Sequence, residues 1–174
     1  IGLGWVYYLQ GKLERAEDEF LKVKELKSQD PDIYIGLGWV YYRQNKFDKA
    51  ENEFIKGKSI RPNDSDALNG LGWTYYRMFT SGKRGEKYLE KSKHQFKEVI
   101  KMNPHHTDAY IGLGWVYYHQ DRMEQAERSF LKAVELNPDF PEVHIGLGWV
   151  YYRWVYYNKE KLKEAEREFL IAKE

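Results

Sequence analysis

Residues 35–42 read Ile-Gly-Leu-Gly-Trp-Val-Tyr-Tyr, and this stretch decides the fold because close copies of it recur along the chain. Successive copies lie 34, 34, 42 and 34 residues apart, and their first glycines are Gly2, Gly36, Gly70, Gly112 and Gly146. A phenylalanine follows each copy at a matching place: Phe20, Phe54, Phe96, Phe130 and Phe169. A fixed period of this kind marks a repeat architecture. We therefore predict a single array over 1–174, with repeats at approximately 1–30, 31–64, 65–106, 107–140 and 141–174.

The composition excludes several classes of protein. The 174 residues carry a formal net charge of +1, so no overall field attracts nucleic acid, and we predict no nucleic-acid partner. The absence of cysteine removes disulfides, thiolate nucleophiles and cysteine-based metal sites. The longest apolar stretches, such as 145–152, reach about half of the roughly 20 residues that a bilayer span needs, so we predict no membrane insertion.

The sequence leaves the compartment open. We favour the cytoplasm slightly, and a secreted or periplasmic location stays as an alternative, because many proteins of each kind have no cysteine. The chain begins inside a copy of the motif, which we interpret as the start of a fragment.

The second repeat predicts two helices. Its first segment carries two stripes at helical spacing: Tyr34, Gly38 and Tyr41, and beside them Ile35, Trp39 and Tyr42. After a polar turn at 44–46, the second segment is apolar on one face through Phe47, Ala50, Phe54 and Gly57. Asp64 or Ser65 can cap the next first helix. Neither helix buries its apolar side alone, so stability must come from stacked neighbours.

These residues resemble the tetratricopeptide repeat signature at its expected spacings. Repeat two matches it at Tyr34, Leu37, Gly38, Tyr41, Ala50, Phe54, Gly57 and Pro62, and repeat four at Tyr110, Leu113, Gly114, Tyr117, Ala126, Phe130, Ala133 and Pro138. The resemblance, to tetratricopeptide scaffold proteins of the bacterial or archaeal type, implies an all-α fold. It implies a right-handed superhelical solenoid of five antiparallel helix–turn–helix repeats, with first helices lining a concave, partner-binding groove.

Two repeats depart from the pattern. Repeat three has eight extra residues between Tyr76 and Phe96, which we expect to lengthen each helix by about one turn, with Gly82 and Gly85 in the displaced turn. Repeat five has five extra residues, because 149–153 is followed by a near copy at 154–158. We expect both insertions at the turn between the first and second helices, and five residues leave the helical phase open.

The second stripe supplies the candidate binding site. Its members are the tryptophan, the tyrosine three residues later and the basic residue after it: Trp39, Tyr42, Arg43, Trp73, Tyr76, Arg77, Trp115, Tyr118, His119, Trp149, Tyr152 and Arg153. A glycine stands three residues before each tryptophan, although glycine inside a helix costs roughly 0.5–1 kcal/mol against alanine. Either these glycines make room for the tryptophan of a neighbouring repeat, or they form notches beside exposed indoles that suit an extended polymer.

The predicted function is a non-catalytic protein–protein interaction scaffold that binds an extended peptide or a helix of a protein partner along this aromatic groove. One alternative is an accessory array that binds a polysaccharide, since regularly spaced rings stack on sugars. Another is a structural protein that self-assembles end to end as a homo-oligomer, because the last second helix leaves Ala165, Phe169 and Ala172 uncovered.

No chemistry-bearing group stands out. Carboxylates such as those at 17–19, and Glu164, Glu166 and Glu168, fit a solvated helix face with ordinary pairing to lysine and arginine. His105, His106 and Asp108 fall in a turn between repeats and lack a second ligand cluster. We therefore expect no enzyme, no cofactor and no metal.

Overall fold

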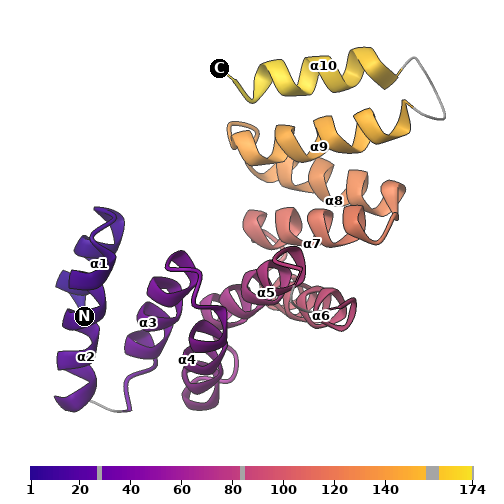
Figure 1. Ribbon diagram of the computed structural model, residues 1–174. Helices are drawn as coiled ribbons and strands as arrows, with labels where there is room; N and C mark the ends of the chain where they lie inside the picture. Colours follow the sequence, from indigo (N-terminus) through magenta and orange to yellow (C-terminus); the bar gives the residue numbers. More distant parts are fainter. Residues whose placement is uncertain (27–28, 83–84, 156–160, 174) are drawn as a thin grey trace. The chain divides into compact units, whose positions relative to one another are not determined.

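The computed structural model describes residues 1–26, 29–82, 85–155 and 161–173, and outside turns these ranges are helical throughout. They form ten α-helices (Figure 1): α1 (Gly2–Leu9), α2 (Leu13–Leu26), α3 (Pro31–Arg43), α4 (Phe47–Ile60), α5 (Ser65–Thr80), α6 (Lys87–Met102), α7 (Thr107–His119), α8 (Met123–Leu136), α9 (Pro141–Trp154) and α10 (Lys161–Ile171). The all-α prediction is confirmed.

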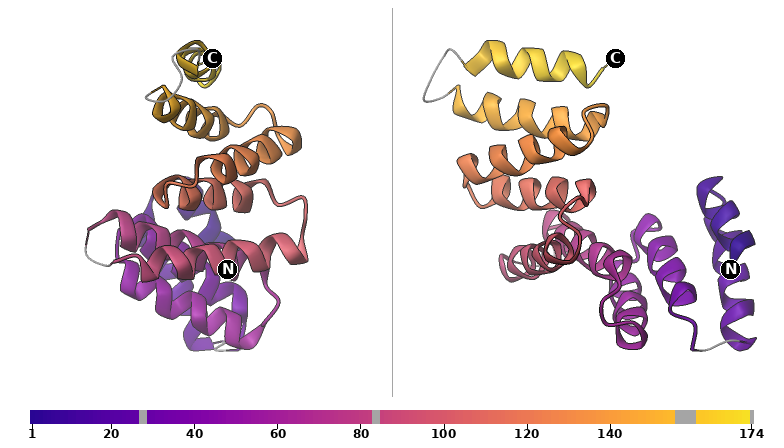
Figure 2. Two further views of the ribbon diagram at one scale, coloured as in Figure 1. Left: turned by 90° about the vertical axis from the view of Figure 1, so that its right-hand side faces the viewer. Right: turned by 180° about the vertical axis from the view of Figure 1, so that it is seen from behind.

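The helices belong to two compact units, 1–95 and 96–174, with α6 running across the division. In the first unit α1 packs on α2, α3 on α4, and each hairpin on the next helix. In the second unit α7 pairs with α8 and α9 with α10, and Figure 2 shows these four helices layered one on another, in orange to yellow. Within each unit the chain therefore forms stacked antiparallel hairpins. The handedness of the solenoid and its continuity over 1–174 stay predictions.

Side-chain caps begin several first helices. Asp30 accepts a hydrogen bond from the amide of Asp32 (3.1 Å), with Pro31 in the first helical turn of α3. Asp64 accepts from two amides at the start of α5, both at 2.9 Å, as the sequence predicted for that position. At the start of α7 the cap is His106, whose Nδ1 accepts from the amide of Ala109. These bonds satisfy donors that a helix start otherwise leaves unpaired.

In repeats one, two and four the core contains a phenylalanine held between two glycines. Phe54 is fully buried, and a methyl group added to Gly38 of the same repeat would lie 2.7 Å from its ring. A methyl group on Gly70 of the next repeat would lie 2.3 Å from the same ring. Phe20 and Phe130 have the same two-sided environment. In repeats two to five the glycine three residues before the tryptophan thus makes room for a phenylalanine of the preceding repeat, so the predicted tryptophan partner is wrong and the packing role is correct.

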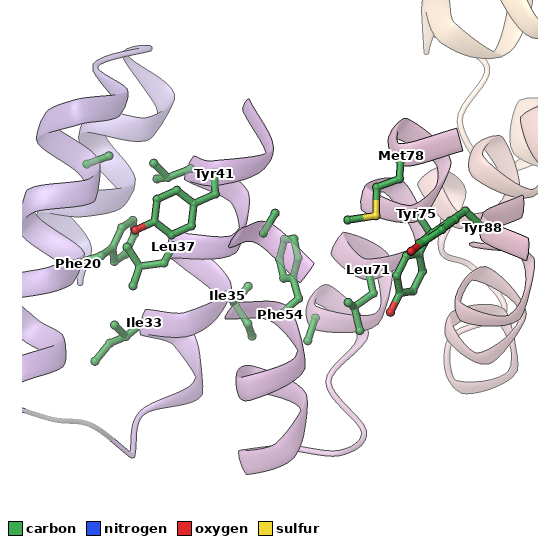
Figure 3. Packing of buried hydrophobic residues seen from close by; sticks show 14 residues of the cluster. Phe20, Ile33, Ile35, Leu37, Tyr41, Phe54, Leu71, Tyr75, Met78 and Tyr88 are labelled. Atoms are coloured by element: carbon green, nitrogen blue, oxygen red, sulfur yellow. The ribbon is translucent and has the colours of Figure 1, made fainter. Parts of the chain in front are cut away.

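The signature tyrosines and leucines complete this core. In the first unit Leu37 and Leu71 are buried among the phenylalanines, and Tyr41 and Tyr75 lie beside them (Figure 3). The pKa values of Tyr41, Tyr75 and Tyr151 are raised, mainly because the side chains are buried. A carboxylate in the second helix of the preceding repeat raises each pKa further through its charge and a hydrogen bond. It belongs to Glu17 for Tyr41, to Glu51 for Tyr75 and to Glu127 for Tyr151. Glu17 therefore joins two repeats, which the expected pairing within its own helix did not foresee.

The insertion in repeat three is shared between its helices and its turn. α5 has 16 residues where α3 has 13, and α6 has 16 where α4 has 14. Each extension is somewhat shorter than the predicted full turn of about 3.6 residues. The remaining residues lie between Thr80 and Lys87, where Gly82 has a positive φ of 71°.

The insertion in repeat five also lies between its two helices. α9 ends at Trp154 and α10 begins at Lys161, so the first residue of the near copy prolongs α9 and Val155 is its C-cap. The rest of the near copy, 156–158, lies outside the described residues. On α10, Ala165 is 2% exposed and Phe169 and Ala172 are half-buried, so the expectation that all three are uncovered is wrong for Ala165.

Candidate functional site

Three tryptophans of the predicted site, Trp39, Trp115 and Trp149, each pack against two rings of their own repeat. The Trp39 ring meets Phe54 edge-on at a centroid distance of 5.3 Å and Tyr42 at 5.5 Å. The same arrangement recurs for Trp5, Trp115 and Trp149 with their own phenylalanine and tyrosine, at 5.4 to 5.9 Å. Edge-to-face pairs of this kind are worth about 0.5–1.5 kcal/mol beyond their buried area. The core therefore fixes the orientation of each of these four indoles.

The stripe of tryptophan and tyrosine is only partly covered. Trp39, Trp73 and Trp115 are half-buried, and Trp149 is 43% exposed with Tyr152 at 55%. By contrast Ile35, which the sequence placed on the same stripe, is 4% exposed. The indoles thus pack on one side and present the other, which accommodates both the packing and the binding interpretation.

Three arginines of the predicted site each contact the preceding repeat. The Arg43 guanidinium lies 5.0 Å from the Tyr8 ring and donates to the carbonyl oxygen of Tyr8 at 2.9 Å. Arg77 lies 5.9 Å from the Tyr42 ring and donates to the Asn45 side chain at 2.9 Å, and Arg153 lies 5.3 Å from the Tyr118 ring with Asp121 at 3.1 Å. Cation–π contacts at partly exposed sites contribute about 0.5–1 kcal/mol each. Each of these arginines thus helps to hold two neighbouring repeats together.

His119 takes the place of an arginine in repeat four. Its ring meets Tyr118 edge-on at 5.5 Å. Burial first, and then the positive charge of Arg153, lower the pKa of His119 below its usual value.

Four residues of the predicted site surround a hollow in the second unit. The hollow has a volume of about 460 Å³, and its lining consists of Tyr118 from α7 and Trp149, Tyr152, Arg153 and Val155 from α9 and its cap. Pockets of roughly this size bind small molecules or single side chains of a partner when a few polar groups stand among apolar ones. The structure thus brings together one predicted residue of repeat four and the three of repeat five, and it adds Val155, which sequence reasoning missed.

Sequence reasoning also missed a buried polar pair. His144 on α9 is 7% exposed, and its Nδ1 lies 2.7 Å from the Glu168 carboxylate while its Nε2 lies 2.8 Å from the carbonyl oxygen of Pro138. Burial works to lower the pKa of His144, but the hydrogen bonds and the charge of Glu168 raise it above its usual value overall. Glu168 thus ties α10 to α9, where we had expected a carboxylate on a solvated face. A histidine at the place of Tyr34 and Tyr110 was the available signal.

Neither a metal cluster nor a membrane span occurs among the described residues. No group of three or more histidine, aspartate or glutamate side chains lies close enough together there to hold a metal ion. Among the ten helices of these ranges, none is both long and apolar enough to span a bilayer.

Three family models match the sequence. Models described as tetratricopeptide repeat match 31–64 and 107–140, and a model described as TPR repeat matches 4–45. Together they cover more than half of the chain, and the hairpins and phenylalanine core agree with them. The chain belongs to the tetratricopeptide repeat family.

Solved structures of other repeat proteins share the fold. The thermophilic TPR protein TTC0263 of Thermus thermophilus is similar with a TM-score of 0.84 and 22% identity, over 99% of this chain and 87% of that one. PilF of Pseudomonas aeruginosa gives 0.80 and 21%, over 98% and 73%. MamA of Desulfovibrio magneticus gives 0.76 and 21%, over 98% and 89%. At such identities the similarity concerns the fold alone. No curated protein matches the sequence.

Proposed function

We propose that this chain is a non-catalytic interaction scaffold that holds an extended peptide or a helix of a protein partner along its aromatic stripe. Tetratricopeptide repeats bind protein partners, and proteins built from them are generally scaffolds without catalytic activity. The finer proposal concerns the surface: the partner contacts the tryptophan, tyrosine and basic residue of each of repeats two to five. These are the twelve residues named in the sequence analysis, from Trp39 to Arg153.

One observation carries the proposal. Trp149 and Tyr152 expose about half of their surface beside a hollow of about 460 Å³, although both rings are oriented by contacts of the core. Aromatic rings that are already ordered lose little conformational entropy on binding, which is why tryptophan and tyrosine dominate the energetics of protein interfaces. An ordered but uncovered indole next to an arginine is therefore the best anchor for a partner in this unit.

The test is a binding experiment with the full chain. A random twelve-residue peptide library displayed on phage is selected against the protein, and enriched peptides are measured by fluorescence polarisation. We expect Trp149→Ala to weaken the enriched peptides at least tenfold. The matched control is Leu131→Ala, which removes a 46% exposed side chain from α8 of the same unit, outside the hollow, and should leave affinity unchanged. No enrichment with the wild-type chain, or equal effects of the two variants, would overturn the proposal.

The two alternatives give different outcomes in parallel experiments. A polysaccharide-binding array would show signals on a glycan array that Trp149→Ala removes, with no peptide enrichment. End-to-end self-assembly would show a mass that rises with concentration in light scattering, through apolar side chains of α10 such as Leu162 and Leu170, which are 52% and 57% exposed.

A further inference from the structure

We infer that Trp154 and Val155, the first two residues of the five-residue insertion in repeat five, build a selectivity pocket that takes one large apolar side chain of the bound peptide. This inference rests on the proposed function, because it assigns an anchor to the same surface. The residue six positions after the tryptophan has a different backbone conformation in repeat five from that in repeats one, two and four.

In the repeats of ordinary length that position is a tight turn. Gly11, Asn45 and Asp121 occupy it in repeats one, two and four, with positive φ angles of 73°, 58° and 59°. Glycine, asparagine and aspartate tolerate this left-handed conformation, and the first helix ends there. In repeat five the position is Val155, a β-branched residue with φ −52° and ψ −30°, which continues the helical path. The near copy of 149–153 thus replaces a turn residue by an apolar side chain.

Trp154 holds this extension in place. Its ring packs against Tyr151 at 6.3 Å, and the Lys161 ammonium lies 5.6 Å from the Trp154 ring and 4.9 Å from the Tyr151 ring. The first residue of the near copy therefore packs back on α9 and α10, while the second, Val155, lines the hollow together with Trp149 and Tyr152. Repeat three uses its own insertion differently, since the equivalent Phe79 packs against the core of the first unit.

The lining favours an apolar side chain of a peptide over a sugar. Among the described residues, three aromatic rings and a valine form most of the wall, and Arg153, the one charged residue of this described lining, already pairs with Asp121 at 3.1 Å. A sugar would bring several hydroxyl groups, and each loses hydrogen bonds to water unless the wall replaces them. A leucine, methionine or phenylalanine side chain has no such requirement and would bury both its own surface and the exposed indole. The occupant we assign is therefore one such side chain on an extended segment.

The sequence offers a direct test. Deleting residues 154–158 returns repeat five to the spacing of repeat four, so the variant has the length of an ordinary repeat. The same random twelve-residue library is selected against the wild-type chain and the deletion variant. We expect the wild type to enrich a large apolar residue at one fixed position of the peptide, and the deletion variant to lose that preference and bind those peptides at least tenfold more weakly.

A pair of point variants covers the case in which the deletion does not fold. Val155→Asp places a carboxylate in the hollow and should weaken peptides with the apolar anchor at least tenfold, whereas Leu131→Asp, on α8, should not. A preference for the apolar residue that persists after the deletion or in Val155→Asp would overturn the inference and leave the proposed function standing. The inference would also be overturned, with the proposed function left standing, if the peptides enriched by the wild-type chain had no apolar residue at a fixed position. Failure of the wild-type chain to enrich any peptide would remove the proposed function itself.

Discussion

Repeats four and five carry the same eight residues, at 111–118 and 145–152, yet they bury them to different extents. Ile111 is 2% exposed and Ile145 is 37% exposed. Phe130 is fully buried and Phe169 is half-buried. Repeat four has α9 packed on both of its helices, whereas the last hairpin has a described neighbour on one side. The comparison shows that a repeat of this kind gets much of its burial from the next hairpin, so identical sequences have different stabilities and different accessible surfaces.

The largest expected difference is at the phenylalanine. Phe130→Ala removes a ring packed against both Gly114 and Gly146, and we expect a loss of about 3–5 kcal/mol of unfolding free energy. Phe169→Ala removes a ring with a described glycine on one side, Gly148, and we expect roughly half of that loss. Urea denaturation followed by circular dichroism measures both. Equal losses would contradict the view that the following repeat completes the core.

The next effect concerns the glycine that receives the ring. A methyl group on Gly146 would lie 2.3 Å from Phe130, so Gly146→Ala should cost about 1–3 kcal/mol even though alanine favours a helix by up to about 1 kcal/mol. Gly2→Ala is the matched control, because Gly2 has the same place in repeat one and nothing lies within 4 Å of the added methyl group. It should be neutral or slightly stabilising. A neutral Gly146→Ala in thermal denaturation would show that the phenylalanine can move aside.

A third difference is the histidine of repeat five, where repeat four has Tyr110. The pKa of His144 is higher in the folded chain than in the unfolded one, because Glu168 and the carbonyl oxygen of Pro138 both accept from its ring. Its contribution is therefore fully present below the unfolded pKa of about 6.5 and is lost as pH rises through the folded pKa.

The matching experiment compares melting temperatures of the wild type and His144→Tyr across pH 5.5 to about 8.5. The wild type should lose stability relative to the variant as pH rises, and subtraction of the two curves cancels the opposite contribution of His119, whose pKa is lowered. A constant difference between the curves would mean that the charge of His144 does not contribute to the stability of repeat five.

The smallest expected effect concerns the ion pair between Arg153 of repeat five and Asp121 of repeat four. Asp121→Asn keeps an acceptor for Arg153 and a residue type that tolerates φ of 59°, and Asn45 already plays this role for Arg77. The Arg153 and Asp121 side chains are 45% and 70% exposed, so we expect a loss of at most about 0.5 kcal/mol that shrinks further in high salt. A loss above about 1 kcal/mol at 1 M salt would show that this contact depends on more than screened charge.

Several residues of the candidate site could be predicted from the sequence, but the residues that lie next to them in the fold could not. The spacing of Trp149 and Tyr152 placed both on one stripe, and the structure brings them to one hollow with Tyr118. The exposure of that stripe in repeat five, and the contribution of Val155, could not be read from spacing. The exposure depends on which part of a neighbouring hairpin packs against the stripe. The contribution of Val155 depends on how far α9 continues beyond the position of the ordinary turn.

The sequence by itself determined the number of repeats, the two helices of each and the identity of the core positions, because helical period and a fixed repeat length are local properties of the chain. Only the tertiary structure decided that Gly146 receives Phe130, that Arg153 lies on Tyr118 and that His144 meets Glu168. These contacts join different hairpins, and the rotation of one hairpin on another follows from the shapes of all the side chains between them.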